Sequence, residues 1–357
     1  MQGEVQPPGR DAELGVLLPN GRTRCTACAR YCEIPEGKIG LCGVRGVVNN
    51  KLRLFVYGTV IAGNVDPIEK KPVTHYQPGS EIFSIATTGC NWLCRYCQNY
   101  DISQRRKVEG TEMTPAQVAE TAASYGAQGI AYTYNEPSIF IEFARDCGIE
   151  AHKRGIFNVF VSNGYDTPES VREMDKFLDC ITVDFKGSGK QDFVRRYIGI
   201  PNADPVFATL KELKEKTKIH VEVTDLIVPQ VGDDLEQAKK LCRFVHDELG
   251  PDTPVHFLRF HPDYKMMEFG STPVETLEKH YDVARKEGLN YAYIGNVPGH
   301  RLEDTYCPGC NQVVIGRHGF YVDAWNLDGK NRCKDCGHRI PVVGTLHKQK
   351  RRFQFIH

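Results

Sequence analysis

The sequence has no long apolar run and no excess of charge of either sign. None of its hydrophobic stretches approaches the length of about 18 residues that a membrane-spanning helix requires, although hydrophobic residues make up 41% of the chain. Lys+Arg and Asp+Glu both total 45, so the formal net charge is zero. We therefore expect no membrane partner, and we expect no nucleic-acid partner because no broad basic face is indicated.

The N-terminal segment MQGEVQPPGRDAELGVL lacks the charged start, continuous apolar stretch and small-residue cleavage site of a secretory signal. A cytoplasmic location is therefore expected, and thiols stay reduced in that compartment. A chain of 357 residues with 14 cysteines then indicates metal or redox chemistry instead of a disulfide framework. The length is sufficient for one large domain with small appendages.

Eleven of the 14 cysteines fall into three tight groups. The groups are Cys25, Cys28, Cys32 and Cys42; Cys90, Cys94 and Cys97; and Cys307, Cys310, Cys333 and Cys336. Such spacings are typical of metal ligands. The remaining cysteines, Cys147, Cys180 and Cys242, are solitary, and we predict that they are small buried hydrophobic residues.

Between residues 81 and 296, short β-rich runs alternate with helix-like stretches, which is the pattern of βα units around a parallel sheet. The predicted strands are 81–88, 129–134, 158–162, 180–185, 220–228, 255–260 and 291–295. The predicted helices are 114–126, 137–155, 167–178, 204–217, 234–250 and 272–288. The expected fold class is α/β, with a partial (β/α)6 TIM-like barrel and a small four-cysteine metal module at each end.

The chain is expected to divide into four parts. Residues 1–50 form the N-terminal four-cysteine metal module, and residues 51–80 form a hairpin and loop connection. Residues 81–300 form the partial barrel. Residues 301–357 form a C-terminal zinc-ribbon-like module that ends in a basic tail, HKQKRRFQFIH, for which a solvated end is the favoured interpretation.

Cys90, Cys94 and Cys97 follow the first predicted barrel strand, in a short polar loop. In parallel α/β folds this edge of the sheet binds ligands. Four thiolates would complete the coordination of a tetrahedral zinc ion or a fully ligated cubane, whereas three leave one metal position open for a substrate or cofactor. A three-ligand zinc site and reduced surface thiols are the other interpretations of these residues.

The spacing C-x3-C-x2-C, with Tyr96 directly before the last cysteine, resembles the signature of the radical S-adenosylmethionine (SAM) superfamily. The resemblance implies a barrel of the radical SAM type and a [4Fe–4S] cluster bound by Cys90, Cys94 and Cys97, with SAM chelated to its unique iron. It also implies reductive cleavage of SAM by an electron from a low-potential donor. The product is a 5′-deoxyadenosyl radical that abstracts hydrogen from substrate.

The end of the second predicted strand extends the resemblance. Asn135 and Glu136, in YTYNEP, stand where the family has a Gly-Gly-Glu-like motif that binds the SAM ammonium. A carboxylate suits this role because charge-assisted hydrogen bonds are strong. For Glu136 the alternative is a helix N-terminal carboxylate that faces the helix dipole.

The third and fourth predicted strands end in Ser162-Asn163-Gly164 and Asp184-Phe185-Lys186-Gly187. These motifs resemble elements of enzymes similar to pyruvate formate-lyase activating enzyme, where they contact SAM or substrate. The resemblance implies that Lys186 pairs with the SAM carboxylate and that Asp184 reaches substrate or Lys186. A turn at Asn163 and a structural ion pair are the alternatives.

Later strand ends carry further polar residues, among which Asp225 and His261 are the candidates for binding SAM or substrate. A satisfied structural role is the competing interpretation for both residues.

The flanking cysteine groups indicate two more metal sites. Cys307, Cys310, Cys333 and Cys336 form two C-x2-C pairs that suit tetrahedral zinc, with iron in a rubredoxin-like site as the alternative. Cys25, Cys28, Cys32 and Cys42 also provide four thiolates. Zinc is favoured there too, and an auxiliary Fe–S cluster that passes electrons to the catalytic cluster is the alternative.

Together these motifs, from about residue 24 to 345, resemble the radical SAM protein of the AmmeMemoRadiSam system. The resemblance implies a radical SAM enzyme that acts on a small-molecule or protein substrate. A glycyl-radical-type activating enzyme that acts on a partner protein is the alternative within the enzyme class. Outside the enzyme class, the alternative is a scaffold protein stabilised by metal ions or a nucleic-acid-binding protein.

Overall fold

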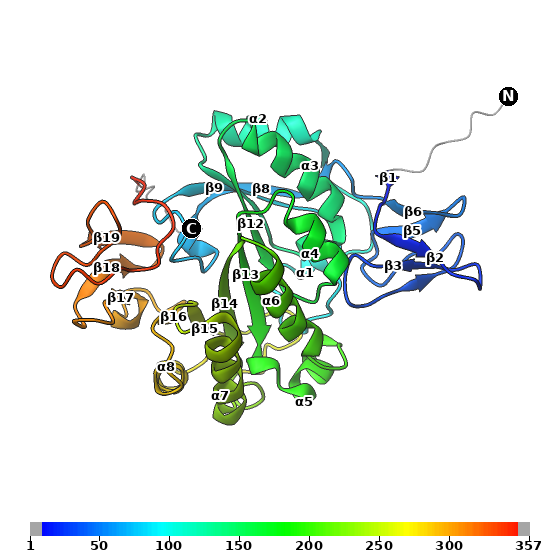
Figure 1. Cartoon of the computed structure of the whole chain (residues 1–357). Coiled ribbons are helices and arrows are strands. Elements are labelled where there is room, and N and C mark those ends of the chain that lie inside the picture. The colour runs from blue at the N-terminus through cyan, green and yellow to red at the C-terminus, as the bar shows by residue number, and fades with distance from the viewer. Residues whose placement is uncertain (1–8, 349–357) are drawn as a thin grey trace.

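The structure, a computed structural model, describes residues 9–348 and is built around one central sheet (Figure 1). Its strands in spatial order are β8 (Ala62–Pro67), β9 (Glu81–Ala86), β11 (Gly129–Tyr132), β12 (Phe157–Ser162), β13 (Cys180–Lys186), β14 (His220–Ile227), β15 (Val255–Arg259) and β16 (Ala292–Gly295). The strands from β9 to β16 run parallel, whereas β8 pairs antiparallel with β9 at one edge. All seven predicted strands are present, and β8 is added from the segment 51–80 that was expected to be a connection.

Helices connect the successive parallel strands and form the βα units of the expected partial barrel. They are α2 (Pro115–Ser124), α3 (Ile141–His152), α4 (Pro168–Met174), α6 (Asp204–Lys216), α7 (Leu235–Phe244) and α8 (Val274–Lys286). Capping explains where several begin: Thr114 and Gln117 form a capping box at α2, and Asp234 accepts two backbone N–H groups at the start of α7.

Shorter helical segments complete the connections. These are α1 (Tyr100–Ser103), α5 (Gln191–Phe193), η1 (Ile68–Lys70), η2 (Pro137–Phe140), η3 (Gly187–Gly189), η4 (Val194–Ile198), η5 (Val245–Leu249) and η6 (Arg301–Glu303). No helix among residues 9–348 is long and apolar enough to cross a membrane.

Two small β modules lie on opposite sides of the barrel (Figure 1). The N-terminal module contains β1 (Arg10–Asp11), β2 (Gly15–Leu17), β3 (Thr23–Cys25), β4 (Glu33–Ile34), β5 (Arg45–Val48) and β6 (Lys51–Leu54). The C-terminal module contains β17 (Thr305–Tyr306), β18 (Val313–His318) and β19 (Tyr321–Trp325). A separate ribbon pairs β7 (Thr59–Val60) with β10 (Thr111–Glu112). Residues 349–357, most of the predicted basic tail, lie outside the described residues.

The barrel strands are buried on both faces, as expected for a parallel sheet covered by helices. All four residues of β11 and five of the six residues of β9 are buried. The solitary cysteines Cys147, Cys180 and Cys242 are fully buried, which confirms their predicted role as core residues. The N-terminal module shares the barrel core, whereas the C-terminal module has a small core of its own with Tyr291 and Tyr293.

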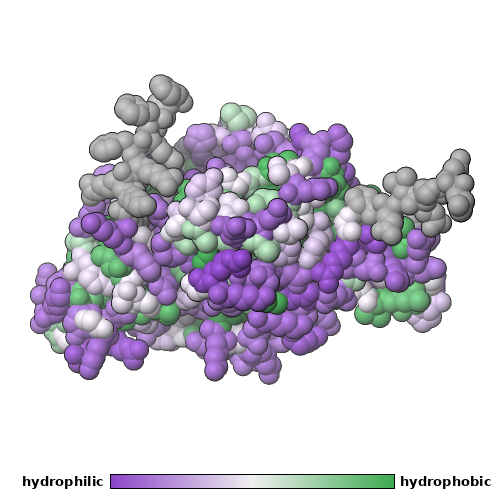
Figure 2. Space-filling view, turned by 90° about the horizontal axis from the view of Figure 1, so that it is seen from above, coloured by the Kyte–Doolittle hydropathy of each residue, from purple (hydrophilic) through white to green (hydrophobic). Residues whose placement is uncertain are grey.

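The surface seen from above the view of Figure 1 is mainly hydrophilic, with small and separate apolar areas (Figure 2). Val16 and Leu17 of the N-terminal module are among the exposed apolar residues.

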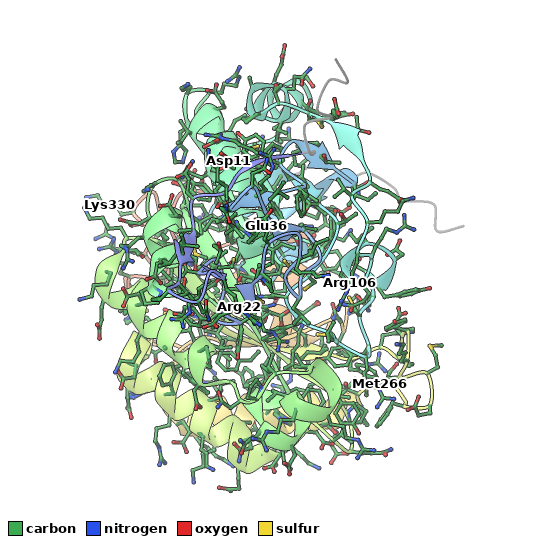
Figure 3. All side chains as sticks on the ribbon, turned by 90° about the vertical axis from the view of Figure 1, so that its right-hand side faces the viewer. Asp11, Arg22, Glu36, Arg106, Met266 and Lys330 are labelled. Carbon is green, nitrogen blue, oxygen red and sulfur yellow. The ribbon has the colours of Figure 1, made fainter. Side chains whose placement is uncertain are left out.

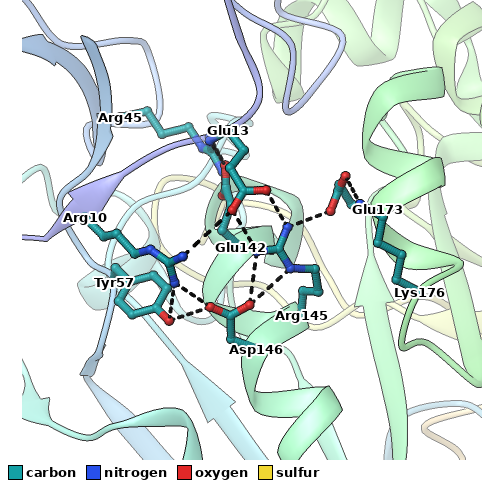
Figure 4. A network of polar contacts seen from close by, with 9 residues as sticks. All are labelled: Arg10, Glu13, Arg45, Tyr57, Glu142, Arg145, Asp146, Glu173 and Lys176. Atoms are coloured by element: carbon teal, nitrogen blue, oxygen red, sulfur yellow. Dashed lines mark hydrogen bonds and ion pairs between the residues drawn. The ribbon is translucent and has the colours of Figure 1, made fainter.

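A network of ion pairs fastens the N-terminal segment to α3 (Figure 4). The guanidinium of Arg45, which is 1% exposed, pairs with the buried carboxylate of Glu142. One turn further along α3, Arg145 donates to Glu13 at 2.7 Å and to Glu173 at 2.8 Å. These contacts join the N-terminal module to two barrel helices, α3 and α4, and so fix its position against the barrel.

We expect Glu142→Ala to lower the free energy of unfolding by about 3–5 kcal/mol, because the charge of Arg45 would remain buried without its partner. Urea unfolding followed by circular dichroism measures this change. Glu275→Ala is the control, since that side chain is 76% exposed and pairs with Lys279 on the surface; its effect should stay within about 0.5 kcal/mol. Equal midpoints for the two variants would contradict the prediction.

Candidate active site at the carboxyl edge of the sheet

A cavity of about 470 Å³ opens at the carboxyl edge of the parallel sheet. The predicted site residues that line it are Cys90, Cys94, Tyr96, Cys97, Asn135, Glu136, Ser162, Asn163, Asp184, Lys186 and His261. The fold therefore brings together residues that are up to 171 positions apart in the chain, from Cys90 to His261. Parallel strands produce this convergence because their carboxyl ends meet at one edge.

Asp225 is the predicted site residue that the structure does not bring to this cavity. Its carboxylate accepts the backbone N–H of Ser188 at 2.8 Å and the Ser188 hydroxyl at 2.6 Å. Burial raises the pKa of Asp225 to about 7. In this structure Asp225 therefore holds the turn after β13 instead of facing the cavity.

The three barrel cysteines lie in the loop that joins β9 to α1. The Cys97 sulfur is 3.1 Å from the Ser103 hydroxyl, and the Cys90 sulfur is 3.8 Å from Asn91 Oδ1. Burial, and then the charge of Glu136, raises the pKa of Cys90 to about 12, and burial raises the pKa of Cys94 well above its ordinary value. Because a metal binds the thiolate, loading this site would release protons.

The three barrel thiols are grouped more loosely than the cysteines of the C-terminal module. Among residues 9–348, the C-terminal four cysteines are the one group of three or more candidate metal ligands that lie close together. All of their ligand atoms are within 4.8 Å of one another. Cys90, Cys94 and Cys97 face one cavity but are not gathered as closely as that. Each thiolate of a cubane binds a different iron, so cluster ligands stand farther apart than the ligands of one zinc ion.

Glu136 joins the end of β11 to the end of β12. Its Oε1 accepts the backbone N–H of Ser138 at 3.0 Å and the Ser162 hydroxyl at 2.9 Å, and its Oε2 accepts the backbone N–H of Asn163 at 2.7 Å. Glu136 thus also caps the helical turn η2, the alternative role considered for it. Burial raises its pKa, and the N–H groups of Asn163 and Ser138 oppose that rise. The charge of this carboxylate, which lines the cavity, suits a cationic ligand there.

Asn135 presents a buried acceptor to the same cavity. Its Nδ2 donates to Thr87 Oγ1 at 3.2 Å and to the Gly89 carbonyl at 2.8 Å, which fixes the orientation of the amide. Its Oδ1 has no hydrogen-bond partner among the described residues, although the side chain is only 7% exposed. Buried polar atoms are almost always paired, so this oxygen fits a ligand that carries N–H donors.

Asp184 and Lys186 form an ion pair at the end of β13. The Lys186 ammonium lies 2.5 Å from Asp184 Oδ2, and Thr224 donates its hydroxyl to Asp184 Oδ1 at 2.9 Å. Burial lowers the pKa of Lys186, but the charge of Asp184 outweighs it, so the pKa is raised overall. Lys186 therefore remains a cation beside the cysteine loop, where its charge favours the thiolate of Cys94.

Lys70, the last residue of η1, and the neighbouring Lys71 also line the cavity, and the sequence did not single them out. Lys71 donates to Asp66 Oδ2 at 2.7 Å, and the Tyr134 hydroxyl donates to the same oxygen at 2.8 Å. The Lys71 ammonium lies 4.7 Å from the centre of the Tyr134 ring. The charged run DPIEKKP was a signal of a polar function there, but its place at the cavity depends on the pairing of β8 with β9.

The C-terminal cysteines have the geometry of a single-ion site. The Cys307 and Cys336 sulfurs are 3.5 Å apart, and those of Cys310 and Cys333 are 3.7 Å apart. Four thiolates at about 2.3 Å around one tetrahedral ion lie roughly 3.8 Å from one another. The four N-terminal cysteines line a second, smaller cavity of their own.

Comparison with known proteins identifies the family. Residues 84–245 match the model of the radical SAM superfamily. The chain belongs to this superfamily. An uncharacterized protein of Methanocaldococcus jannaschii is 42% identical over 337 residues, which cover 94% of this chain and 99% of that protein.

One solved structure supports the fold of this radical SAM enzyme. A radical SAM methyltransferase from Sphaerobacter thermophilus superposes with a TM-score of 0.50 and 16% identity, over 61% of this chain and 66% of that one. A domain of pyruvate-formate lyase-activating enzyme from Bacteroides vulgatus has a TM-score of 0.41 and 17% identity, over 48% of this chain and all of that domain. Membership of the superfamily implies a [4Fe–4S] cluster and SAM as cofactors.

Proposed function

We propose that this radical SAM enzyme cleaves SAM reductively at a [4Fe–4S] cluster held by Cys90, Cys94 and Cys97. One electron from a low-potential donor breaks a C–S bond of SAM and gives methionine and a 5′-deoxyadenosyl radical. The radical removes a hydrogen atom from substrate and becomes 5′-deoxyadenosine. The observation that carries the proposal is the convergence of these three thiols with Asn135, Glu136 and Lys186 on one cavity.

The polar residues of the cavity suit the two charged groups of the methionine part of SAM. Asn135 Oδ1, which has no partner among the described residues, and the carboxylate of Glu136 would receive the ammonium. Lys186, held by Asp184, would pair with the carboxylate. Opposite charges on the two sides then set the orientation of SAM relative to the cysteine loop.

The substrate would enter on the side of the cavity where the exposed His261 lies. Both a small molecule and a segment of a protein are compatible with an opening of this kind. Within the superfamily we assign the chain to the AmmeMemoRadiSam group, on the motifs TTGCNWLCRYCQNYDISQ, YTYNEPS, SNG and VDFKG.

Cys97→Ala is expected to reduce the formation of 5′-deoxyadenosine to the background seen without enzyme, because the cluster loses one of its three ligands. Anaerobically reconstituted protein with SAM and dithionite, analysed by liquid chromatography, measures this product. Cys242→Ala, at a buried core cysteine on α7, is the matched control and should keep wild-type turnover. Wild-type turnover by Cys97→Ala would exclude the proposed function.

For Glu136→Gln we expect the Kd for SAM to rise about tenfold, equivalent to about 1.4 kcal/mol, since a neutral amide replaces the charged acceptor of the ammonium. Equilibrium binding of SAM to the reconstituted protein measures the change. Asp166→Asn is the comparison, because Asp166 is also buried and approaches Ser162 at 3.4 Å but does not line the cavity. Equal losses in the two variants would indicate a structural effect and would rule out this role of Glu136.

We also propose that the C-terminal module binds one zinc ion through Cys307, Cys310, Cys333 and Cys336. The short distances between these sulfurs support a single ion. The double variant Cys310→Ser/Cys333→Ser should lose about one zinc per chain and keep the iron of the catalytic cluster. Mass spectrometry of metals in the purified protein measures both elements, and Cys147→Ala/Cys180→Ala is the matched double control. If the double variant instead lost about one iron per chain with no loss of sulfide, the module would be a rubredoxin-like iron site and the zinc proposal would be wrong.

A further inference from the structure

The four N-terminal cysteines converge on one small cavity inside the N-terminal module. Cys25 is the last residue of β3, and its backbone N–H donates to the Cys32 carbonyl at 2.9 Å, which brings the two residues side by side. Cys28 and Cys42 complete the lining, together with apolar residues such as Ile34. Cys25 and Cys28 are buried, and all four thiols are free of disulfides. Four reduced thiols that line one cavity can serve as a set of metal ligands.

The four N-terminal thiols are not gathered as closely as the four thiols of the C-terminal module. All four lie within the described range 9–348, yet they do not form a group whose ligand atoms are all within 4.8 Å. The catalytic cysteines do not form such a close group either, whereas the C-terminal cysteines have sulfurs 3.5 and 3.7 Å apart. A cubane, whose thiolates bind four separate irons, requires the wider arrangement.

Two buried N–H donors at the same cavity have no acceptor. Asn91 is 1% exposed and lines the cavity, and its Nδ2 has no hydrogen-bond partner among the described residues. The same holds for Nη2 of Arg30, which also lines the cavity. An unpaired buried donor is costly, and its presence indicates a bound group that accepts hydrogen bonds. The sulfur atoms of an Fe–S cluster are such acceptors.

The cavity lies directly beside the catalytic cysteine loop. Asn91 contributes Nδ2 to the N-terminal cavity, while its Oδ1 is 3.8 Å from the Cys90 sulfur. The backbone of the two parts is also in close contact, because a Cβ placed on Gly89 would lie 2.4 Å from the Cys42 carbonyl oxygen. Figure 3 views the molecule from the side of the N-terminal module, which carries Arg22 and Glu36 and lies in front of the barrel.

From these observations we propose that Cys25, Cys28, Cys32 and Cys42 bind an auxiliary [4Fe–4S] cluster that passes electrons to the catalytic cluster. A low-potential one-electron donor reduces the auxiliary cluster, which then gives this electron to the catalytic cluster and returns to its oxidised state. No bond is made or broken at the auxiliary cluster, since all its irons carry thiolates. The looser grouping of these four thiols and the N–H donors beside them favour a cluster over the zinc ion that the residue spacing alone favoured.

The first experiment removes the catalytic cluster and counts metals. Cys90→Ala/Cys94→Ala/Cys97→Ala, purified anaerobically and reconstituted with ferrous iron and sulfide in the presence of equimolar zinc, should bind about four iron and four sulfide per chain. Wild-type protein should bind about eight of each. An iron-free triple variant with about two zinc ions per chain would overturn the proposal.

A second variant keeps the test decisive. Cys25→Ser/Cys28→Ser/Cys32→Ser/Cys42→Ser should retain about four iron and the zinc of the C-terminal module, which reports that the chain is folded. If this variant does not fold, the iron and sulfide counts of the wild-type protein and of the triple variant still test whether the N-terminal cysteines bind a cluster. The iron, sulfide and zinc counts do not depend on SAM cleavage. An absent auxiliary cluster can therefore be distinguished from a failure of the proposed function.

The electron transfer between clusters rests on the proposed function and has its own readout. In fully reduced wild-type protein, two neighbouring paramagnetic clusters should give an electron paramagnetic resonance spectrum broadened by spin–spin interaction. The sum of the spectra of the two cysteine variants is the reference without interaction. A wild-type spectrum identical to that sum would overturn the electron transfer.

Discussion

The active site depends on one buried carboxylate, that of Glu136. It accepts hydrogen bonds from the turn that follows it and from the end of the next strand, through Ser138, Ser162 and Asn163. A loop and a strand end that would otherwise be separate are thereby held in a fixed relation. Because the carboxylate is buried, these bonds act in a medium of low polarity, where they are strong and where their loss is costly.

From Glu136 a continuous set of contacts leads to both cysteine groups. Asn163, positioned by Glu136, donates its side-chain amide to Asn91 Oδ1 at 2.7 Å. Asn91 in turn contacts Cys90 on one side and lines the N-terminal cysteine cavity on the other, where Arg30 donates to its carbonyl at 2.9 Å. The barrel rim, the catalytic loop and the N-terminal module are therefore one polar unit, which the ion pairs of α3 hold in place.

The unpaired buried groups of this unit differ between its two cavities. Asn135 Oδ1 is an acceptor at the barrel cavity, whereas Asn91 Nδ2 and Arg30 Nη2 are donors at the N-terminal cavity. An acceptor fits the ammonium of SAM, and donors fit the sulfurs of a cluster. The two cavities thus differ in the sign of the group that they complement, although cysteines line both.

The sequence by itself determined the βα order of the barrel, the position of Cys90, Cys94 and Cys97 after its first strand, and the polar residues at the later strand ends. These follow from local patterns: apolar runs, helix caps and short cysteine spacings. Tertiary structure alone decided that Asp225 turns to Ser188 and that Lys71, paired with Asp66 of β8, lines the cavity. It also decided that the C-terminal thiols gather within 4.8 Å of one another while the N-terminal thiols do not. The physical reason is that distances between side chains far apart in the chain are set by packing, which no local pattern specifies.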